Sequence, residues 1–324
     1  PSGHLGTMAS RQRHWFATAH ASGEIQLHAL YQNPTVSSAT VNDNVFTMDT
    51  NIASSIPIET EMGVPPLCLS LNFANTASTS DHDATTTIPI VSTYSTGKVA
   101  IHNVVFIENG GVSIIAQDEW EAHNKFTNQD EVWSADFFGQ SVVVSCGDEG
   151  KVKVWDVRAT NRPMQVLTPF EAGATCASKH PRQEHLMAVG SYDETICLLY
   201  IRYMGTGKTN MKQLCRTKPL GGGIWRIKWH PILDHRILAA AMHGGCRVME
   251  VDGLNRSLGS HFDDGLQTPP EDPFSVTKQF TEHESMAYGA DWLVCKHPTR
   301  NGFFEAAASC SFYDRNVFVW DTLP

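Results

Sequence analysis

Two strands of this chain end in the same Trp-Asp dipeptide, and the segments before them recur along the sequence. The two endings are Trp155-Asp156 and Trp320-Asp321. Each closes a strand in which apolar and polar side chains alternate; further alternating strands lie at residues 24–28, 98–102, 195–199 and, in a degenerate copy, 246–251. Alternation with a period of two indicates β-strands, and their recurrence about every 45 to 75 residues indicates an array of small sheets.

A strand of small residues comes before each alternating strand, and an apolar strand precedes most of these. The small-residue strands lie at 16–19, 90–93, 143–146, 187–190, 238–241 and 306–309. The apolar strands lie at 68–73, 132–137, 175–178, 224–229 and 288–292. Small residues suit the narrow inner part of a wedge, so each set is typical of one β-propeller blade. We therefore expect an all-β fold, a Trp-Asp repeat β-propeller that has seven blades when complete and whose N-terminal strands are missing from this chain.

The expected domain organisation is simple. Residues 1–10 resemble a linker or a cloning remnant, and residues 11–324 form a single propeller domain. Three segments rich in Ser, Thr, Asn, Asp or Pro interrupt the repeat, near 32–56, 75–87 and 257–275. They offer too little apolar surface to offset the entropy of ordering, so we expect flexible insertions there.

Composition excludes several classes of function. The net charge of −10 argues against nucleic acid or an anionic membrane as the main partner. The sequence contains no run of about 18 apolar residues, so it predicts no transmembrane helix. The eight cysteines are scattered without a Cys-x-x-Cys motif, which favours buried reduced thiols in a cytoplasmic protein. We expect a monomer that binds neither a metal nor another cofactor.

Several His, Ser and Asp residues match the hydrogen-bonded tetrad of Trp-Asp repeats, in which an imidazole bridges a hydroxyl and a turn carboxylate beside the strand Trp. One set is His123, Asp148 and Trp155; a second is His283, Ser311, Asp314 and Trp320; Ser191 and Asp193 form a partial set. The same residue types build Ser-His-Asp catalytic triads. The structural interpretation is favoured here, because the residues follow the repeat.

His243 lies in a turn whose chemistry does not require a histidine. The segment His243-Gly244-Gly245 resembles the oxyanion-hole segment of lipases, but the chain has no Gly-x-Ser-x-Gly elbow. Its glycines are explained by positive φ angles in a turn. The equivalent turns of other blades hold Asp148, Asp193 and Asp314. These turns share one face of a propeller, so His243 is predicted to lie near carboxylates at the channel mouth.

Aromatic and basic residues also start the innermost strands. Trp225 and Tyr288 are predicted near the channel entrance, either as filler or as a wall for a bound side chain. Arg226 alternates with Trp225 and needs an anionic partner. The preceding run Gly221-Gly222-Gly223 leads into a strand and lacks the Lys-Ser/Thr ending of a phosphate loop, so we expect it to let the chain pass close to the entrance.

Five strings are more specific than the Trp-Asp endings. They are 185–194 (HLMAVGSYDE), 222–231 (GGIWRIKWHP), 242–245 (MHGG), 288–292 (YGADW) and 309–314 (SCSFYD). In order and placement they resemble the diphthine methyl ester hydrolases (diphthine methylesterases) of the diphthamide pathway, a Trp-Asp repeat family. The resemblance covers residues 12 to 323 and is weaker before 110.

The resemblance implies hydrolysis of the methyl ester of methylated diphthine on elongation factor 2, which frees a carboxylate for the final amidation. The substrate carries a trimethylammonium group, which aromatic faces and carboxylates bind well. Trp225, Trp133 and Tyr288 are candidates for the first role, and Asp193 and Asp314 for the second. Our hypothesis makes His243 the general base, oriented by Asp193 or Asp314, with Tyr288 or Arg226 near the developing oxyanion. A Ser or Cys nucleophile stays open.

Two other functions compete with this one. A non-catalytic Trp-Asp repeat scaffold that docks protein partners has the same tetrads and needs no hydrolase motif. A metal-dependent hydrolase requires clustered ligands, whereas the histidines are dispersed.

Overall fold

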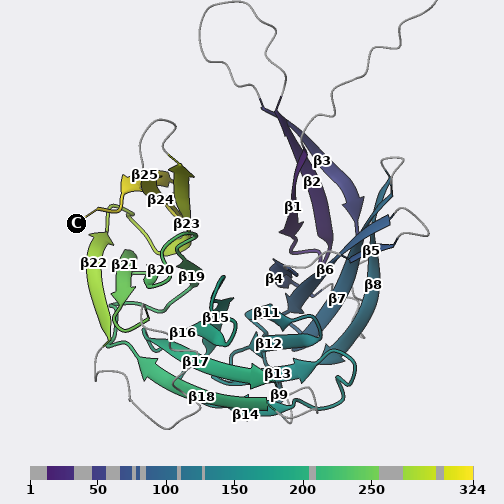
Figure 1. Ribbon diagram of the computed structural model, residues 1–324, viewed down its shortest axis with the longest axis horizontal. Helices are drawn as coiled ribbons and strands as arrows, with labels where there is room; N and C mark the ends of the chain where they lie inside the picture. Colours follow the sequence, from purple (N-terminus) through teal and green to yellow (C-terminus); the bar gives the residue numbers. More distant parts are fainter. Residues whose placement is uncertain are drawn as a thin grey trace, which may run out of the picture.

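The structure is a computed structural model that describes residues 13–32, 46–55, 66–74, 78–80, 85–107, 111–125, 128–203, 209–254, 273–296 and 303–323. Within these ranges the chain forms strands and no helix. Six sheets stand around a central axis in an arc that is open between the first and last sheets (Figure 1). The predicted all-β Trp-Asp repeat propeller is confirmed.

The first half of the arc holds two sheets and a short hairpin. The first sheet has the order β1 (Arg13–Ala19), β2 (Ile25–Gln32), β3 (Phe46–Ser54). The second has the order β4 (Cys68–Phe73), β6 (Thr85–Tyr94), β7 (Lys98–Ile107), β8 (Val112–Glu121), and β5 (Ser78–Ser80) also pairs with β6. The hairpin of β9 (Asn124–Lys125) and β10 (Asn128–Gln129) follows.

The remaining four sheets repeat one antiparallel meander. They are β11 (Ser134–Gly139), β12 (Val142–Cys146), β13 (Val152–Asp156), β14 (Gln165–Leu167); β15 (Ala174–Lys179), β16 (Leu186–Ser191), β17 (Ile196–Tyr203), β18 (Thr209–Arg216); β19 (Arg226–Trp229), β20 (Arg236–Ala240), β21 (Cys246–Val251), β22 (Phe274–Phe280); and β23 (Ala287–Lys296), β24 (Phe303–Ser311), β25 (Val317–Asp321). Because each meander runs in the same sense, the turns between second and third strands all lie at one end of the channel.

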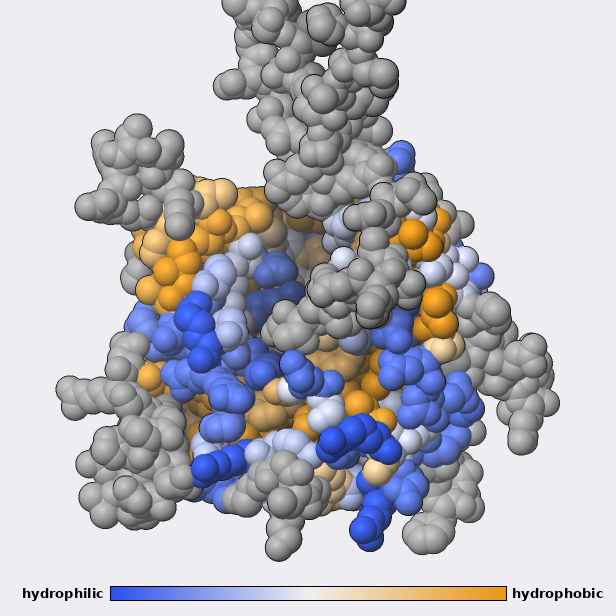
Figure 2. Space-filling view, turned by 45° about the vertical axis from the view of Figure 1, so that its right-hand side comes forward, coloured by the Kyte–Doolittle hydropathy of each residue, from blue (hydrophilic) through white to orange (hydrophobic). Residues whose placement is uncertain are grey.

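The core lies between neighbouring sheets. In one cluster Val144 and Val154 of the β11–β14 sheet pack with Met187 and Leu199 of the next sheet, and all four side chains are fully buried. The strand alternation that defines each repeat therefore supplies both faces of a blade. On the last sheet, by contrast, large apolar side chains are exposed, among them Phe312, Tyr313, Val317 and Val319. Apolar surface is visible on that side in Figure 2.

The three predicted insertions are partly strands, so the expectation of loops over their whole length was wrong. Strand β3 lies within 32–56 and pairs with β2 from Gln32↔Phe46 to Gln26↔Ser54. Strand β5 and the start of β6 lie within 75–87, and β22 begins inside 257–275. An edge strand is held by backbone hydrogen bonds, so polar side chains do not prevent it. Residues 1–10 and the rest of these segments lie outside the described residues.

The first tetrad forms with a different acid from the predicted one. Ser145 Oγ accepts a hydrogen bond from Trp155 Nε1 (2.8 Å) and lies 2.8 Å from His123 Nε2. The other imidazole nitrogen, Nδ1, lies 2.9 Å from Glu149 Oε1, not against Asp148. The two acids are successive turn residues that point in different directions, and Asp148 instead contacts the Trp133 indole.

The second tetrad likewise uses a different hydroxyl. Ser309 Oγ lies 2.9 Å from His283 Nε2 and accepts from Trp320 Nε1 (3.1 Å), while Asp314 Oδ2 lies 3.2 Å from His283 Nδ1. Ser311 was predicted in this role, but it lies two residues further toward the turn on the same face of β24. Both tetrads hold the loop that enters a blade against its inner strands.

Candidate functional site

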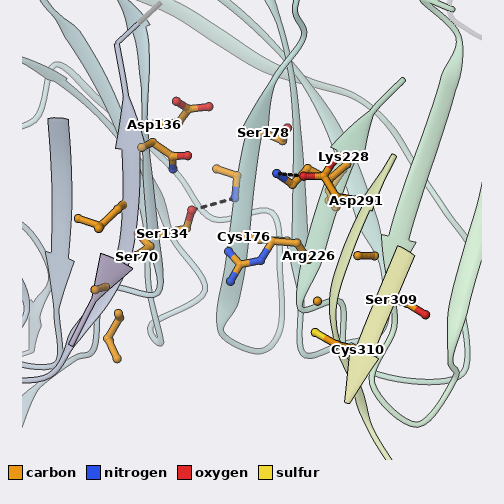
Figure 3. Close-up of a pocket in the computed structure, with 18 of the residues that line it drawn as sticks. Ser70, Ser134, Asp136, Cys176, Ser178, Arg226, Lys228, Asp291, Ser309 and Cys310 are labelled. Atoms are coloured by element: carbon orange, nitrogen blue, oxygen red, sulfur yellow. Dashed lines mark hydrogen bonds and ion pairs between the residues drawn. The ribbon is translucent and has the colours of Figure 1, made fainter. Parts of the chain in front are cut away.

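A central channel runs between the inner strands and encloses a cavity of about 590 Å³ (Figure 3). Its wall comes from β1, β4, β11, β15, β19, β23, β24 and Val317 of β25. Small polar side chains, including Ser70, Ser134, Ser178 and Ser309, share the lining with alanines and other apolar residues. Four charged residues also reach the cavity: Asp136, Arg226, Lys228 and Asp291.

Three of these four charged groups have partners. Lys228 Nζ lies 3.0 Å from Asp291 Oδ2. Asp136 Oδ2 accepts a hydrogen bond from the Lys179 backbone N–H (3.2 Å), and burial raises the pKa of the Asp136 carboxyl to about 6. Both carboxylates that line the channel therefore already have a partner within the protein.

Arg226 is different. In the described part of the chain its guanidinium has neither a hydrogen bond nor an ion pair, although its side chain is only partly exposed. It reaches toward Cys176 in the channel wall (Figure 3). Burial raises the pKa of the Cys176 thiol to about 11, and the nearby Arg226 charge opposes that rise. Cys176 is thus protonated near neutral pH, which weakens it as a nucleophile.

Four aromatic rings meet at one end of the channel, and we call them the aromatic cluster: Trp133, Tyr192, Trp225 and Tyr288. The Trp225 ring centroid lies 5.2 Å from that of Trp133, 5.3 Å from Tyr288 and 5.9 Å from Tyr192. Trp133 and Tyr192 are 6.1 Å apart. Each ring comes from or next to a different sheet, so the cluster spans four consecutive blades. All four side chains are partly exposed, which leaves their free faces accessible to a ligand.

Glycines before β19 let the chain pass over the Tyr192 ring. A Cβ on Gly223 would lie 3.2 Å from Tyr192 Cδ1 and 3.1 Å from Met242 Sδ. A Cβ on Gly222 would collide with the Ala241 carbonyl. A larger residue at either position would therefore crowd the β20–β21 turn or Tyr192. The close passage near the channel entrance that the sequence predicted for these glycines is confirmed.

Two carboxylates lie beside the aromatic cluster. Asp148 Oδ1 accepts a hydrogen bond from Trp133 Nε1 (3.2 Å). Burial and the Asp148 charge both raise the pKa of Glu131. Burial, followed by the charges of Asp148 and Glu131, raises the pKa of Tyr192 to about 12. The cluster therefore combines aromatic faces with negative charge, a combination that attracts a cation.

The two carboxylates proposed from the sequence have other partners. Asp193 accepts from Thr195 Oγ1 (2.6 Å) and pairs with Arg216 Nη2 (2.5 Å). Asp314 pairs with His283 of its tetrad. Each acid pins a turn of its own sheet, and neither is joined to His243 by a hydrogen bond or ion pair in the described residues. The predicted orientation of His243 by Asp193 or Asp314 is therefore absent from the structure.

His243 lies on the β20–β21 turn, exposed to solvent and without a hydrogen bond to any described residue. Its neighbour Met242 has φ of +37° and pairs with Ala287, the residue before Tyr288. This bridge keeps the turn at the end of the channel where the aromatic cluster lies. The structure thus brings His243 to the correct rim but gives it no acid partner among the residues described.

Tyr288 is suited to donate a hydrogen bond at this rim. Burial raises the pKa of its phenol, and Tyr313 adds to the rise. The hydroxyl is then protonated near neutral pH; it contacts the Met286 sulfur at 4.0 Å and also hydrogen-bonds with the Tyr313 side chain. A ligand oxygen would take the Tyr288 proton in place of these two contacts.

The sequence interpretation missed two groups of the site. Tyr192 lay inside one of the distinctive strings but was given no role. Asp148 was predicted at the channel mouth but was not linked to the aromatic residues. Glu131 directly precedes a predicted inner strand and carried no repeat signal. In the part of the chain that the structure covers, no set of three His, Cys, Asp or Glu side chains is placed to hold a metal ion, and no helix could cross a membrane.

Known proteins give a consistent comparison. Residues 117–156 match the family model of the WD domain, G-beta repeat. The chain is 29% identical to the diphthine methyltransferase homolog of Dictyostelium discoideum, covering 71% of this chain and 59% of that protein. It is 30% identical to the diphthine methyltransferase of Mus musculus (74% and 45%) and 29% identical to that of Homo sapiens (69% and 44%).

These relatives confirm the resemblance inferred from the sequence strings, since they carry diphthine in their names and the repeat family agrees. The chain spans about half the length of the relatives it matches.

Proposed function

We propose that this propeller acts in the diphthamide pathway as a methyl ester hydrolase. It would remove the methyl ester of methylated diphthine on elongation factor 2, acting as a cytoplasmic monomer without a cofactor. The aromatic cluster with Asp148 and Glu131 is the observation that carries the proposal. Similarity to proteins named for diphthine supports the pathway, and the sequence strings support the hydrolase class.

The cluster matches the fixed cation of this substrate. A trimethylammonium group cannot donate a hydrogen bond, so an aromatic wall holds it more effectively than hydrogen-bond acceptors would. Trp225 offers the central ring, with Trp133 and Tyr288 on either side. Asp148 adds negative charge at the edge of Trp133. We propose these residues for cation binding, in place of Asp193 and Asp314, which the sequence had suggested.

The methyl ester and the trimethylammonium group belong to the same side chain of methylated diphthine, so the reacting carbonyl would lie near the rim as well. In the proposed step water attacks the ester carbon while His243 accepts its proton. Collapse of the tetrahedral intermediate breaks the bond to the methoxy oxygen, which leaves as methanol after taking up a proton, and the carboxylate stays on the substrate. Protonated Tyr288 or the Arg226 guanidinium would stabilise the negative oxygen.

One mass measurement separates this reaction from its rivals. The purified full-length protein is incubated with elongation factor 2 bearing methylated diphthine, and the modified peptide is weighed. Hydrolysis removes one methylene mass. A methyl transfer, the activity in the names of the relatives, would add one methylene mass to unmethylated substrate when S-adenosylmethionine is supplied. If neither mass changes while the two proteins form a complex, the scaffold alternative is favoured and the proposal fails.

A further inference from the structure

The Arg226 side chain occupies a distinctive position in the channel. It is the first residue of β19 and follows Trp225, the central ring of the aromatic cluster. Arg226 lines the central cavity, and Figure 3 shows its side chain on the channel wall beside Cys176. Thiols lie close to it, because its charge acts on both Cys146 and Cys176. No carboxylate pairs with it among the described residues.

An unpaired guanidinium in a partly enclosed channel is costly unless an anion reaches it. The two acids that line the same cavity have other partners. Asp291 pairs with Lys228, which lies two residues after Arg226 on β19. Asp136 accepts a hydrogen bond from a backbone N–H of β15. Since the other charged groups of the cavity have partners and Arg226 has none in the described chain, its partner is expected to come from a bound ligand.

The position of Arg226 also limits what that ligand is. The aromatic cluster takes a cation, and the next residue along the chain takes an anion. A ligand that uses both groups carries a positive and a negative charge in one molecule, as a betaine does, with a quaternary ammonium on the carbon next to a carboxylate.

We propose that Arg226 is a carboxylate-binding residue and that the channel end is a betaine site. This inference rests on the proposed function and deepens it: ester hydrolysis converts a neutral ester beside the ammonium into a carboxylate. Arg226 would then bind the product, and the negatively charged intermediate, more tightly than the ester. The protein would be inhibited by its own product.

A pair of small probes tests the site without elongation factor 2. N,N,N-trimethylglycine carries both charges, whereas N,N,N-trimethylglycinamide keeps the cation and replaces the carboxylate by a neutral amide. Binding of each is followed by saturation transfer to its methyl protons in NMR. A charge-assisted pair in a partly solvated site predicts that wild type binds the acid about tenfold more tightly than the amide. R226Q removes this preference, and R226K keeps part of it.

Lys228 provides the matched control, because it lines the same cavity on the same strand but is paired with Asp291. K228Q should keep the preference for the acid, and W225A should weaken both probes alike. The inference is overturned if R226Q, verified as folded by its unfolding transition, keeps the wild-type preference, if K228Q loses it equally, or if wild type does not prefer the acid. Loss of methyl from elongation factor 2 is measured separately, so either proposal can fail while the other stands.

Discussion

The acid of the first tetrad is identified by two conservative substitutions in one turn, E149Q and D148N. The Glu149 side chain is 1% exposed and faces His123 Nδ1 at 2.9 Å, Lys151 Nζ at 2.5 Å and Lys153 Nζ at 2.6 Å. Burial alone would raise the pKa of Glu149, but these three contacts lower it well below its usual range. Its charge is thus strongly stabilised by the fold.

The magnitude follows from these contacts. Hydrogen bonds to charged groups contribute about 1.5 to 3 kcal/mol each, and the amide introduced by E149Q would keep one neutral acceptor while leaving two lysines without a counter-charge. Lys151 is 35% exposed, so water replaces part of its interaction. We expect E149Q to lower the free energy of unfolding by about 3 kcal/mol, which corresponds to a drop of about 4 °C in Tm. D148N removes an exposed charge but keeps an oxygen for Trp133, so Tm should move by less than about 1 °C.

Thermal unfolding monitored by circular dichroism measures both variants, and turnover of methylated elongation factor 2 is measured beside it. D148N should raise KM about threefold, because it removes a carboxylate next to the aromatic cluster. E149Q should leave KM unchanged at a temperature where it is folded. A destabilisation of D148N equal to that of E149Q would refute the assignment of the tetrad acid to Glu149.

Three further predictions concern other residues. His102 is buried beside Ser92, and burial lowers its pKa to about 4, so the unfolded chain binds the proton first. The free energy of unfolding should therefore fall by up to about 3 kcal/mol as pH drops from about 6.5 to 4; H102Q should flatten this dependence in urea unfolding at a series of pH values. W225L should raise KM about 30-fold with a smaller change in kcat, and W225F should recover part of the loss, because up to about 2 kcal/mol of cation–π attraction is removed. H243Q should slow hydrolysis about 100-fold without changing Tm; turnover at the wild-type rate would eliminate His243 as the base.

The strands could be predicted because their signal is local. The inner strand expected at residues 68–73 matches β4, and the inner strand expected at 224–229 contains β19. Alternation and small-residue composition are properties of five or six successive residues, so no distant contact is needed to read them. Strand β3 escaped prediction because its pairing with β2 uses backbone groups, which every sequence has.

The site was harder to predict, since its contacts join separate sheets. The sequence placed Trp225 and Tyr288 near the channel entrance, and the structure brings Trp133 to the same cluster. Tyr192 meets them through a turn of the sheet between, and Gly223 passes close to its ring. The choice between Asp148 and Glu149 depends on backbone angles inside one turn, which repeat patterns do not specify.

Charged groups that have a partner within the protein stabilise the fold, whereas charged or titratable groups without one are available to a ligand. Glu149, Asp193 and Asp314 are acids on turns, and each is tied to a base of its own sheet or of the loop that enters it. These paired acids stabilise their turns through hydrogen bonds and ion pairs. A substrate could bind to them only if one of those pairs were broken. Arg226 and His243 lie at the same end of the channel without such pairs among the described residues, so binding a ligand there breaks no interaction seen in the structure. For the same reason, substitutions at these two positions should affect ligand binding or turnover while leaving the stability of the propeller nearly unchanged.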